Sequence, residues 1–431
     1  MGVIVGVLLL GAILAALLSN SDPFSPAKFF LASYALFCLG AWSQPRDVSV
    51  WLMLLLVLLV GVITVAMESV MLRDETRARG WFMPLRSIDR VRTIRWVWLL
   101  SLPPLLAQFA VIRFYGGLFG YINILGNRVL EFRGMGWLNT LTSMLLVMNL
   151  LYFAVGLLEK QSRRWWGGYA AHLLIVTGIG LLSGSRSGVL SVFAMQAFLV
   201  HYLHRRVSVS KAISLGALLV LAASALGVIR DGLKVDDGQL VTGLSAGERI
   251  FQTAIFNYGV EPLEILSQSR GLELTLGSTF ASVVTNVVPR VLWPGKPDTG
   301  GVVFTKVYTG DAWGGASNLT PTFLGEWIIN FGWVPGALLF VLSYTAMLAY
   351  TVRLYRRTIR HAQQDRGVDT AIDVVRYVCV LWAVVGLMVG EFTNVVLGLV
   401  LHRLAPLWLM RALIAPGVLP PVSSAGTAGT D

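Results

Sequence analysis

The sequence predicts an all-α, polytopic membrane protein, and two observations support this fold class. Hydrophobic residues make up 55% of the 431 residues and charged residues only 13%, which is too little polar surface for a water-soluble protein of this size. Apolar runs of about 17 to 25 residues recur along almost the whole chain, and each is long enough to cross a bilayer as a helix. We therefore expect about eleven transmembrane helices and one large loop outside the membrane.

The expected helices follow these apolar runs in chain order. The first run has no basic residues before it, so we interpret Gly2–Leu18 as a retained span and not as a cleaved signal peptide. The expected spans are 2–18, 27–43, 49–71, 95–112, 137–158, 165–183, 187–204, 212–229, 332–352, 373–391 and 395–414.

Basic residues gather in four short loops between these helices, and their positions set the expected orientation. Cytoplasmic loops of membrane proteins are enriched in Lys and Arg, and with this helix count all four loops fall on one side. The C-terminus is then cytoplasmic and the N-terminus outside. The net charge of +11 is explained in this way without a nucleic-acid partner. The basic loops contain Arg73–Arg95, Lys160–Arg164, His204–Lys211 and Arg353–Arg366.

The chain divides into four regions. They are N-terminal transmembrane helices over 1–229, a large outer loop over 230–331, C-terminal transmembrane helices over 332–415, and a tail over 416–431 that we expect to be disordered because it is rich in small residues and proline. The outer loop carries seven basic and ten acidic residues, the opposite bias to the cytoplasmic loops. Loops of this length in compact proteins are usually functional. Its apolar stretches TFASVVTNVVPRVLW and TPTFLGEWIINFGWV predict short helices that dip into the membrane or lie on it.

The stretch GLLSGSRSGVL places Arg186 between two apolar runs, in a turn on the outer side. Glycines let backbone amides approach an anion, Ser185 and Ser187 supply hydroxyls, and a guanidinium offers a planar fork that matches phosphate oxygens. The turn therefore predicts a site for a phosphate group. The alternative is a tight hairpin turn whose arginine extends to the interface.

The stretch NVVPRVLWPGKPD adds two cations, Arg290 and Lys296, and ends at Asp298. Its prolines hold an irregular backbone and its Trp is suited to the membrane interface. Together with Arg186, the two cations would form an outer pocket suited to a pyrophosphate. The alternative is a proline-rich connector with solvated charges.

Candidate acids follow in two outer segments. SNLTPTFLGEWIINFG brings Asn318, Glu326 and Asn330 into apolar surroundings, and VGEFTNVV places Glu391 at another outer turn. A carboxylate in either place could serve as a general base. The alternative for Glu326 is a capping role at the membrane interface.

The sequence contains no motif that indicates a metal or a nucleotide. GxxxxGK[ST] and HExxH are absent, and no GxGxxG lies in a strand–turn–helix context. The two cysteines, Cys38 and Cys379, lie inside apolar runs and are expected to be inert. We expect neither a metal nor a cofactor.

These features resemble the Wzy-type repeat-unit polymerases of O-antigen and exopolysaccharide synthesis. The resemblance is carried by about eleven helices with one large late loop, by the turn at 183–188, by Pro-Arg and Trp-Pro-x-Lys-Pro at 289–297, and by LGEWIINFG, which ends at 332. The short loops between helices are most similar to those of the capsule and exopolysaccharide polymerases, such as the xanthan type.

The resemblance implies a GT-C-like glycosyltransferase in the bacterial inner membrane, with its active site facing the periplasm. Such an enzyme joins oligosaccharide repeat units carried on undecaprenyl pyrophosphate, beside a flippase and a chain-length regulator of the same pathway. It would place Arg186 and Arg290 on the pyrophosphate, with Lys296 assisting. It leaves the general base open among Glu326, Asp298 and Glu391.

Two other functions fit parts of the sequence. An O-antigen ligase would share the chemistry and differ in its acceptor. A lipid-linked oligosaccharide flippase is the alternative from another class, but transporters usually have matching halves and charges at mid-membrane, whereas the ionisable residues here gather at one outer face.

Overall fold

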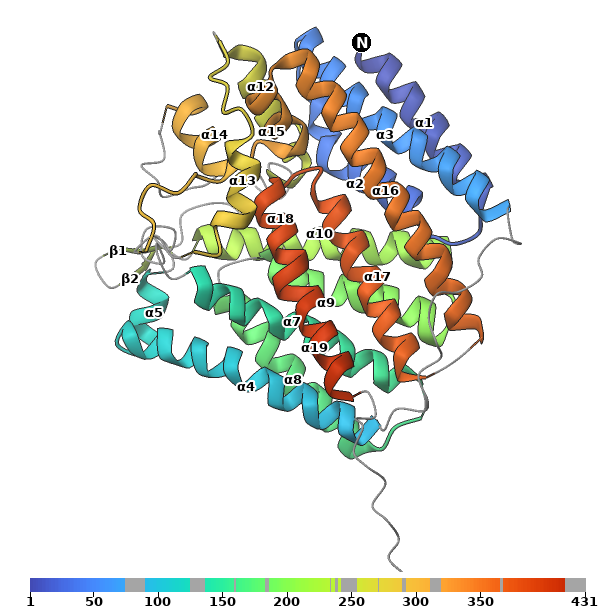
Figure 1. Ribbon diagram of the computed structural model, residues 1–431, viewed down its shortest axis with the longest axis vertical. Helices are drawn as coiled ribbons and strands as arrows, with labels where there is room; N and C mark the ends of the chain where they lie inside the picture. The colour runs from blue at the N-terminus through green and yellow to red at the C-terminus, as the bar shows by residue number, and fades with distance from the viewer. Residues whose placement is uncertain are drawn as a thin grey trace, which may run out of the picture.

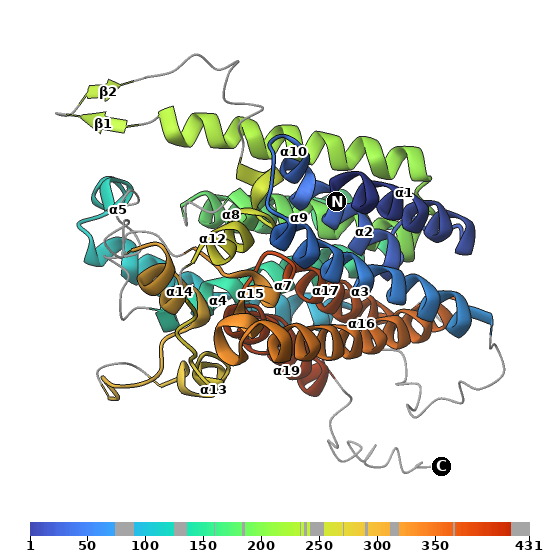
Figure 2. The ribbon, with the colours of Figure 1, turned by 90° about the horizontal axis from the view of Figure 1, so that it is seen from above.

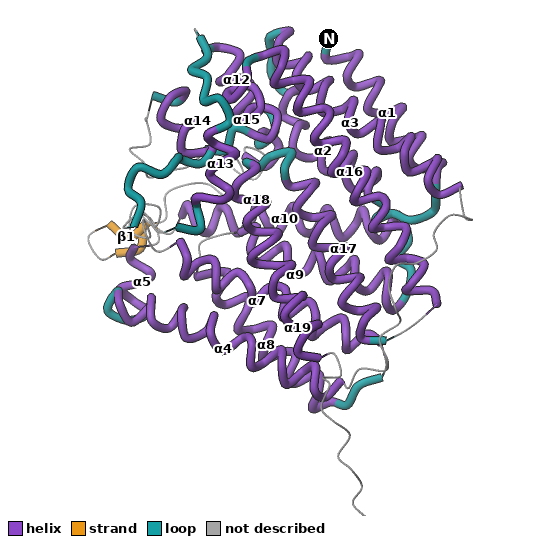
Figure 3. The backbone as a smooth tube through the Cα atoms, viewed as in Figure 1, coloured by secondary structure: helices purple, strands orange, loops and turns teal. Residues whose placement is uncertain are grey.

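The computed structural model describes residues 1–73, 90–124, 136–158, 160–182, 186–232, 234–236, 239–241, 254–269, 271–288, 292–310, 319–364 and 367–414. Helices make up almost all of this part of the chain (Figure 3). The predicted all-α fold class is confirmed, with one addition. A short antiparallel hairpin pairs β1 (Lys234–Asp236) with β2 (Gln239–Val241).

A helix lies at every position where the sequence predicts a span. These helices are α1 (Gly2–Ser19), α2 (Pro26–Cys38) with η1 (Leu39–Trp42), α3 (Val48–Arg73), α4 (Arg90–Phe114), α7 (Gly136–Leu158), α8 (Arg163–Leu182), α9 (Arg186–Leu199) with η3 (Val200–His204), α10 (Val209–Gly232), α16 (Trp333–Gln364), α17 (Val368–Gly386), and α18 (Phe392–Leu399) with η5 (Val400–Leu404) and α19 (Ala405–Ile414).

Seven of the described helical segments are long and apolar enough to cross a membrane, as expected for a polytopic membrane protein. They are Gly2–Ser19, Val48–Met71, Val91–Phe114, Leu141–Leu158, Arg163–Leu182, Trp333–Ala362 and Phe392–Ile414. Three further apolar helices are shorter: Pro26–Trp42, Gly188–His204 and Val209–Ala225.

Short helices occupy the described part of the large loop and of the segment after α4. They are α5 (Leu118–Ile124), η4 (Ala254–Asn257), α12 (Glu261–Gln268), α13 (Ser278–Thr285), α14 (Gly300–Tyr308) and α15 (Thr322–Phe331). The two short helices predicted in the loop are thus present as α13 and α15. Figures 1 and 2 both show α5, the β hairpin, α13 and α14 at the same side of the bundle. The segment after α4 and the large loop therefore share one face.

Helix α7 lies at the centre of the bundle, where it packs against α4, α8, α9 and α17. Its buried residues include Val147, Leu151 and Val155, which recur every fourth position and so share one face of the helix. By contrast, α1 exposes Leu10 and Leu18, 68% and 80% accessible. Such exposure of large apolar side chains fits a surface that faces lipid.

A chain of buried polar side chains crosses the bundle between α9, α7, α8 and α4. Gln196 Nε2 donates to Asn149 Oδ1 at 2.9 Å, and Asn149 Nδ2 lies 3.1 Å from His172 Nδ1. Ser101 Oγ donates its hydrogen to the Val97 carbonyl at 2.7 Å, so His172 Nε2 must donate to Ser101 Oγ, 3.0 Å away. Each member has a partner, as polar groups inside an apolar bundle require.

Candidate active site

Glu326 and Glu391, two of the predicted site residues, lie close together and fully buried. Glu326 belongs to α15 and Glu391 immediately precedes α18, and both side chains are 0% exposed. The charge of Glu391 acts directly on Glu326. The sequence identified both acids as candidates but did not predict that they form a pair.

The carboxylate of Glu326 joins α13, α15 and α18. Its Oε1 accepts a hydrogen bond from Thr279 Oγ1 at 2.9 Å, and its Oε2 accepts from the backbone N–H of Phe392 at 2.6 Å. Gly300, at the start of α14, packs on the same carboxylate so closely that an added Cβ would lie 2.6 Å from Oε1. A side chain at position 300 would therefore push α14 away from Glu326.

The carboxylate of Glu391 joins α14 to α18. It accepts hydrogen bonds from the backbone N–H of Gly301, in the first turn of α14, and from the side-chain amide of Asn394. Glu391 is also the N-cap residue of α18. Because the N-terminus of a helix favours negative charge, the starts of two helices stabilise this pair of acids.

Asn330 supports the pair from one side. Its Nδ2 donates to Thr279 Oγ1 at 2.7 Å, which directs the Thr279 hydroxyl hydrogen to Glu326. Its Oδ1 accepts from Thr275 Oγ1 at 2.7 Å and from the N–H of Gly277 at 2.8 Å, where the backbone has φ of 87°. Asn330 therefore holds the turn into α13 against α15.

Burial raises the pKa of both acids, because a charged carboxylate is poorly solvated there. For Glu326 the pKa rises to about 8, with the neighbouring charge of Glu391 adding to the effect of burial. The backbone N–H groups of Phe392 and Gly301 oppose this rise. At neutral pH we therefore expect Glu326 to be mostly protonated.

Lys296 faces inward, toward the end of α13. Its Nζ donates to Asn286 Oδ1 at 3.1 Å and to the carbonyl of Val288 at 2.7 Å, and the residue is only 8% exposed. The ammonium group thus binds carbonyl oxygens of its own loop. This arrangement ties Lys296 to the end of α13.

Asp298 is the most accessible of the three candidate bases. Its side chain is 26% exposed and its Oδ2 lies 2.9 Å from Nζ of Lys306 in α14. Asp298 stands just before the N-terminal turn of α14, which Glu326 and Glu391 hold in place.

The remaining predicted residues lie outside the described side chains. Arg186 and Ser187 are the first two residues of α9, so this part of the predicted turn is helical, and their side chains are not among those described. Ser185, Arg290 and Asn318 fall outside the described residues, as does the tail over 416–431. The convergence of Arg186 and Arg290 therefore stays a prediction.

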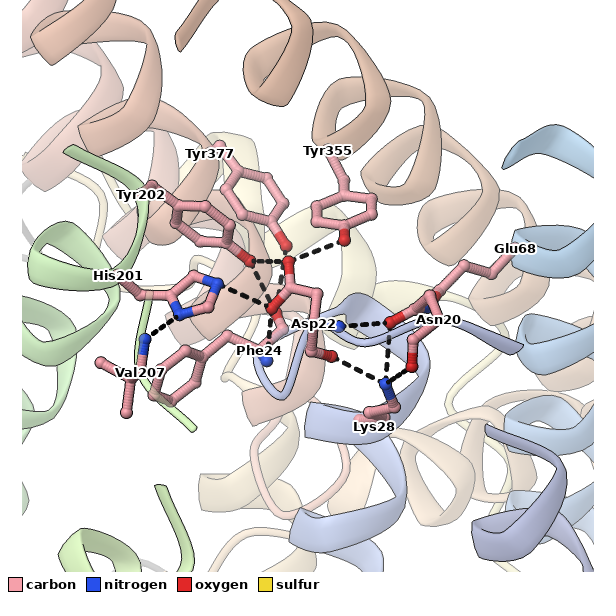
Figure 4. Close-up of polar contacts among 10 residues, drawn as sticks. All are labelled: Asn20, Asp22, Phe24, Lys28, Glu68, His201, Tyr202, Val207, Tyr355 and Tyr377. Atoms are coloured by element: carbon pink, nitrogen blue, oxygen red, sulfur yellow. Dashed lines mark hydrogen bonds and ion pairs between the residues drawn. The ribbon is translucent and has the colours of Figure 1, made fainter. Parts of the chain in front are cut away.

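A second buried polar cluster lies at the other end of α1 and centres on Asp22 (Figure 4). Its carboxylate accepts from Tyr202 Oη at 3.0 Å, from Tyr355 Oη at 2.7 Å, and from the backbone N–H of Phe24 at 2.8 Å. His201 Nε2 is 3.1 Å away. The Val207 N–H donates to His201 Nδ1 at 2.9 Å, so Nε2 carries the ring hydrogen that points to Asp22.

Lys28 and Glu68 extend this cluster toward α3. Lys28 Nζ donates to Asn20 Oδ1 at 2.7 Å and to two backbone carbonyls, while Glu68 accepts from the N–H of Ala27 at 3.0 Å and from the side chain of Asn20. Every oxygen and nitrogen here has an intramolecular role. The cluster therefore fastens the turn between α1 and α2 to η3, α3 and α16, and we assign it a structural role.

Comparison with protein families, with curated proteins and with solved structures finds no match to this chain.

The sequence did not single out Thr279, Gly300 or Gly301 as site residues. Gly300 and Gly301, directly after Thr299, are the one feature of the sequence that could have indicated this contact. Two small residues at the start of a helix permit the close approach of another group. Thr279 gave no signal, since a threonine in an apolar helix is unremarkable in sequence.

Proposed function

We propose that the protein is a glycosyltransferase that polymerises oligosaccharide repeat units carried on undecaprenyl pyrophosphate. One observation carries the site assignment: Glu326 and Glu391 clamp the first turn of α14 and thereby fix Asp298, whose carboxylate is partly exposed, directly before that turn. The membrane architecture and the sequence motifs that resemble Wzy-type polymerases support the class of reaction.

In the proposed reaction, a hydroxyl oxygen of one lipid-linked unit attacks the anomeric carbon of the chain on the second lipid. The bond between that carbon and the pyrophosphate oxygen breaks, and undecaprenyl pyrophosphate leaves. The hydroxyl proton passes to a carboxylate. Holding both lipid carriers in one membrane lowers the entropic barrier to the encounter.

We assign the general base to Asp298 and a positioning role to the buried pair. A base must reach the attacking hydroxyl. Glu326 and Glu391 are fully buried and their oxygens already accept hydrogen bonds, whereas Asp298 is partly exposed. Arg186 and Arg290 would stabilise the charge that develops on the pyrophosphate, since preorganised guanidinium groups suit that task.

We place the enzyme in the bacterial inner membrane with eleven spans, and its α13–α15 side in the periplasm. The basic loops at the other ends of the helices favour this orientation. A lipid-linked substrate delivered to the outer leaflet would then meet the site without a nucleotide.

The test compares Asp298→Asn with Lys306→Gln, which breaks the same ion pair but keeps the carboxylate. Each variant is expressed in a strain that lacks the gene, its membrane insertion is confirmed, and polymer length and the lipid-linked pool are measured. We expect Asp298→Asn to lower polymerisation by about 10²- to 10⁴-fold and to accumulate single repeat units on lipid pyrophosphate. Lys306→Gln should retain most activity.

Two results would count against these assignments. Normal polymer from Asp298→Asn would exclude that carboxylate as the base, and normal polymer from Arg186→Ala combined with Arg290→Ala would exclude the arginines. Polymer of normal length in the deletion strain itself would exclude the proposed function.

A further inference from the structure

A pocket of about 700 Å³ opens where α7 ends and the chain turns into α8. Phe153, Leu157 and Trp166 form its apolar wall, and Lys160, Gln161 and His204 contribute its polar groups. It lies at the opposite end of α8 from the start of α9 at Arg186, so it is separate from the proposed active site.

The pocket sits at the ends of two segments that are long and apolar enough to cross a membrane, Leu141–Leu158 and Arg163–Leu182. The ends of such segments meet the headgroup region of a bilayer. Aromatic rings cluster around the pocket, with Trp165 and Trp166 at 4.9 Å and Phe153 and Tyr169 at 5.3 Å between ring centroids. Tryptophan and tyrosine concentrate at this level of a membrane because their rings are amphipathic.

Gly156 allows the aromatic cluster to close against α7. A Cβ at this position would lie 2.0 Å from a ring carbon of Trp165. The pocket wall is therefore built by close packing of α7 on the start of α8.

Basic side chains lie in and around the pocket. Lys160 lines it, and none of the described residues that line it is acidic. The side chains of Lys160, Gln161 and His204 have no hydrogen-bonding partner among the described residues. The neighbouring exposed cations are Arg163, Arg164, Arg205 and Arg206.

We propose that this pocket binds the headgroup of an anionic phospholipid. Lys160, Gln161 and His204 would donate to the phosphate oxygens, and an acyl chain would lie along Phe153, Leu157 and Trp166. The ligand follows from charge complementarity at headgroup depth, where basic pockets between helices hold anionic lipids. The inference is independent of the reaction proposed for the other face.

Native mass spectrometry of the purified full-length protein tests this proposal. Phosphatidylglycerol and phosphatidylcholine with the same acyl chains are titrated separately. We expect a one-to-one adduct that prefers phosphatidylglycerol, and a weakening of roughly fivefold in Lys160→Gln. Trp166→Ala should also weaken it. Arg353→Gln, which removes an exposed arginine of α16 outside the pocket, should leave binding unchanged.

Equal binding of the two lipids would overturn the proposal. So would equal losses in Lys160→Gln and Arg353→Gln, because that result indicates general surface charge. Inorganic phosphate provides the last test: if it displaces the lipid at equal concentration, the pocket is a site for free phosphate and the lipid assignment is wrong.

Discussion

At the scale of single residues, the buried acids determine what each carboxylate can do. Glu326 and Glu391 accept hydrogen bonds with both oxygens, which suits a role in fixing α14 and α18. Asp298 combines solvent access with a fixed backbone position. Accessibility thus separates a candidate base from candidates that position it, which residue type alone could not do.

The raised pKa of Glu326 predicts a pH-dependent stability. Its pKa is about 8 in the folded protein, above the ordinary value of 4.5, so the folded state binds more protons than the unfolded state between these two values. Stability should therefore fall as pH rises from about 4.5 to about 8. In Glu326→Gln this part of the pH dependence should disappear, so the variant should gain stability relative to the unmodified protein as pH rises.

Thermal unfolding in detergent between pH 5 and pH 9 measures this effect. Asp47→Asn, an exposed acid beyond the cluster, serves as the control and should keep the original pH dependence. If Glu326→Gln is less stable than the unmodified protein by the same amount at every pH, protonation of Glu326 does not contribute to the pH dependence of stability.

At the scale of elements, the sequence predicted the helices well and their ends less well. The helix expected at 137–158 is found at 136–158, because an uninterrupted apolar run determines its length. The helix expected at 373–391 instead covers Val368–Gly386. The apolar run continues beyond Gly386, but there the chain turns and the Leu387 carbonyl accepts the Phe323 N–H at 3.1 Å, which brings Glu391 to α14.

The difference between local sequence patterns and long-range contacts also explains which parts of the site could be predicted. Glu326 and Glu391 stood out because acids are rare in apolar surroundings. Their pairing depends on contacts between α13, α14, α15 and α18, which periodicity does not encode. The Asp22 cluster gave no signal at all, since its members come from four separated parts of the chain, 20–28, 68, 201–202 and 355.

The Asp22 cluster predicts a strong dependence of bundle stability on one side chain. Asp22→Ala leaves the hydroxyl of Tyr355 and the ring N–H of His201 without their acceptor, at a cost of about 1–3 kcal/mol for each buried group, whereas the Tyr202 hydroxyl keeps the Phe24 carbonyl at 3.1 Å. We expect a large drop in unfolding temperature. Asp22→Asn keeps one acceptor oxygen and should lose less.

Asp47→Ala makes the same chemical change at an exposed position and should have little effect. Equal unfolding temperatures for Asp22→Ala and Asp47→Ala would mean that the cluster does not hold the α1–α2 turn to η3 and α16.

At the scale of the whole molecule, the short elements of the large loop and the basic helix ends lie at opposite ends of the bundle. The helix α8 separates the start of α9 at Arg186 from the cations at 160–164, and its 20 residues extend about 30 Å, the thickness of a bilayer's hydrocarbon. The salt bridge between Arg46 and Glu264 ties the link between α2 and α3 to α12 on the loop side. A membrane that crosses the bundle between its two ends accounts for the position of the large loop at one end and of the basic residues at the other.

This arrangement predicts opposite accessibility for two introduced cysteines. Lys306 and Arg206 are exposed, and the native Cys38 and Cys379 are buried, so a membrane-impermeant maleimide should react only at the introduced thiols. Lys306→Cys should be labelled in intact spheroplasts, and Arg206→Cys only after the membrane is permeabilised. Labelling of Arg206→Cys alone in intact spheroplasts would reverse the orientation. Labelling of both would mean that no membrane separates the two ends, and the lipid-linked reaction would lose its basis.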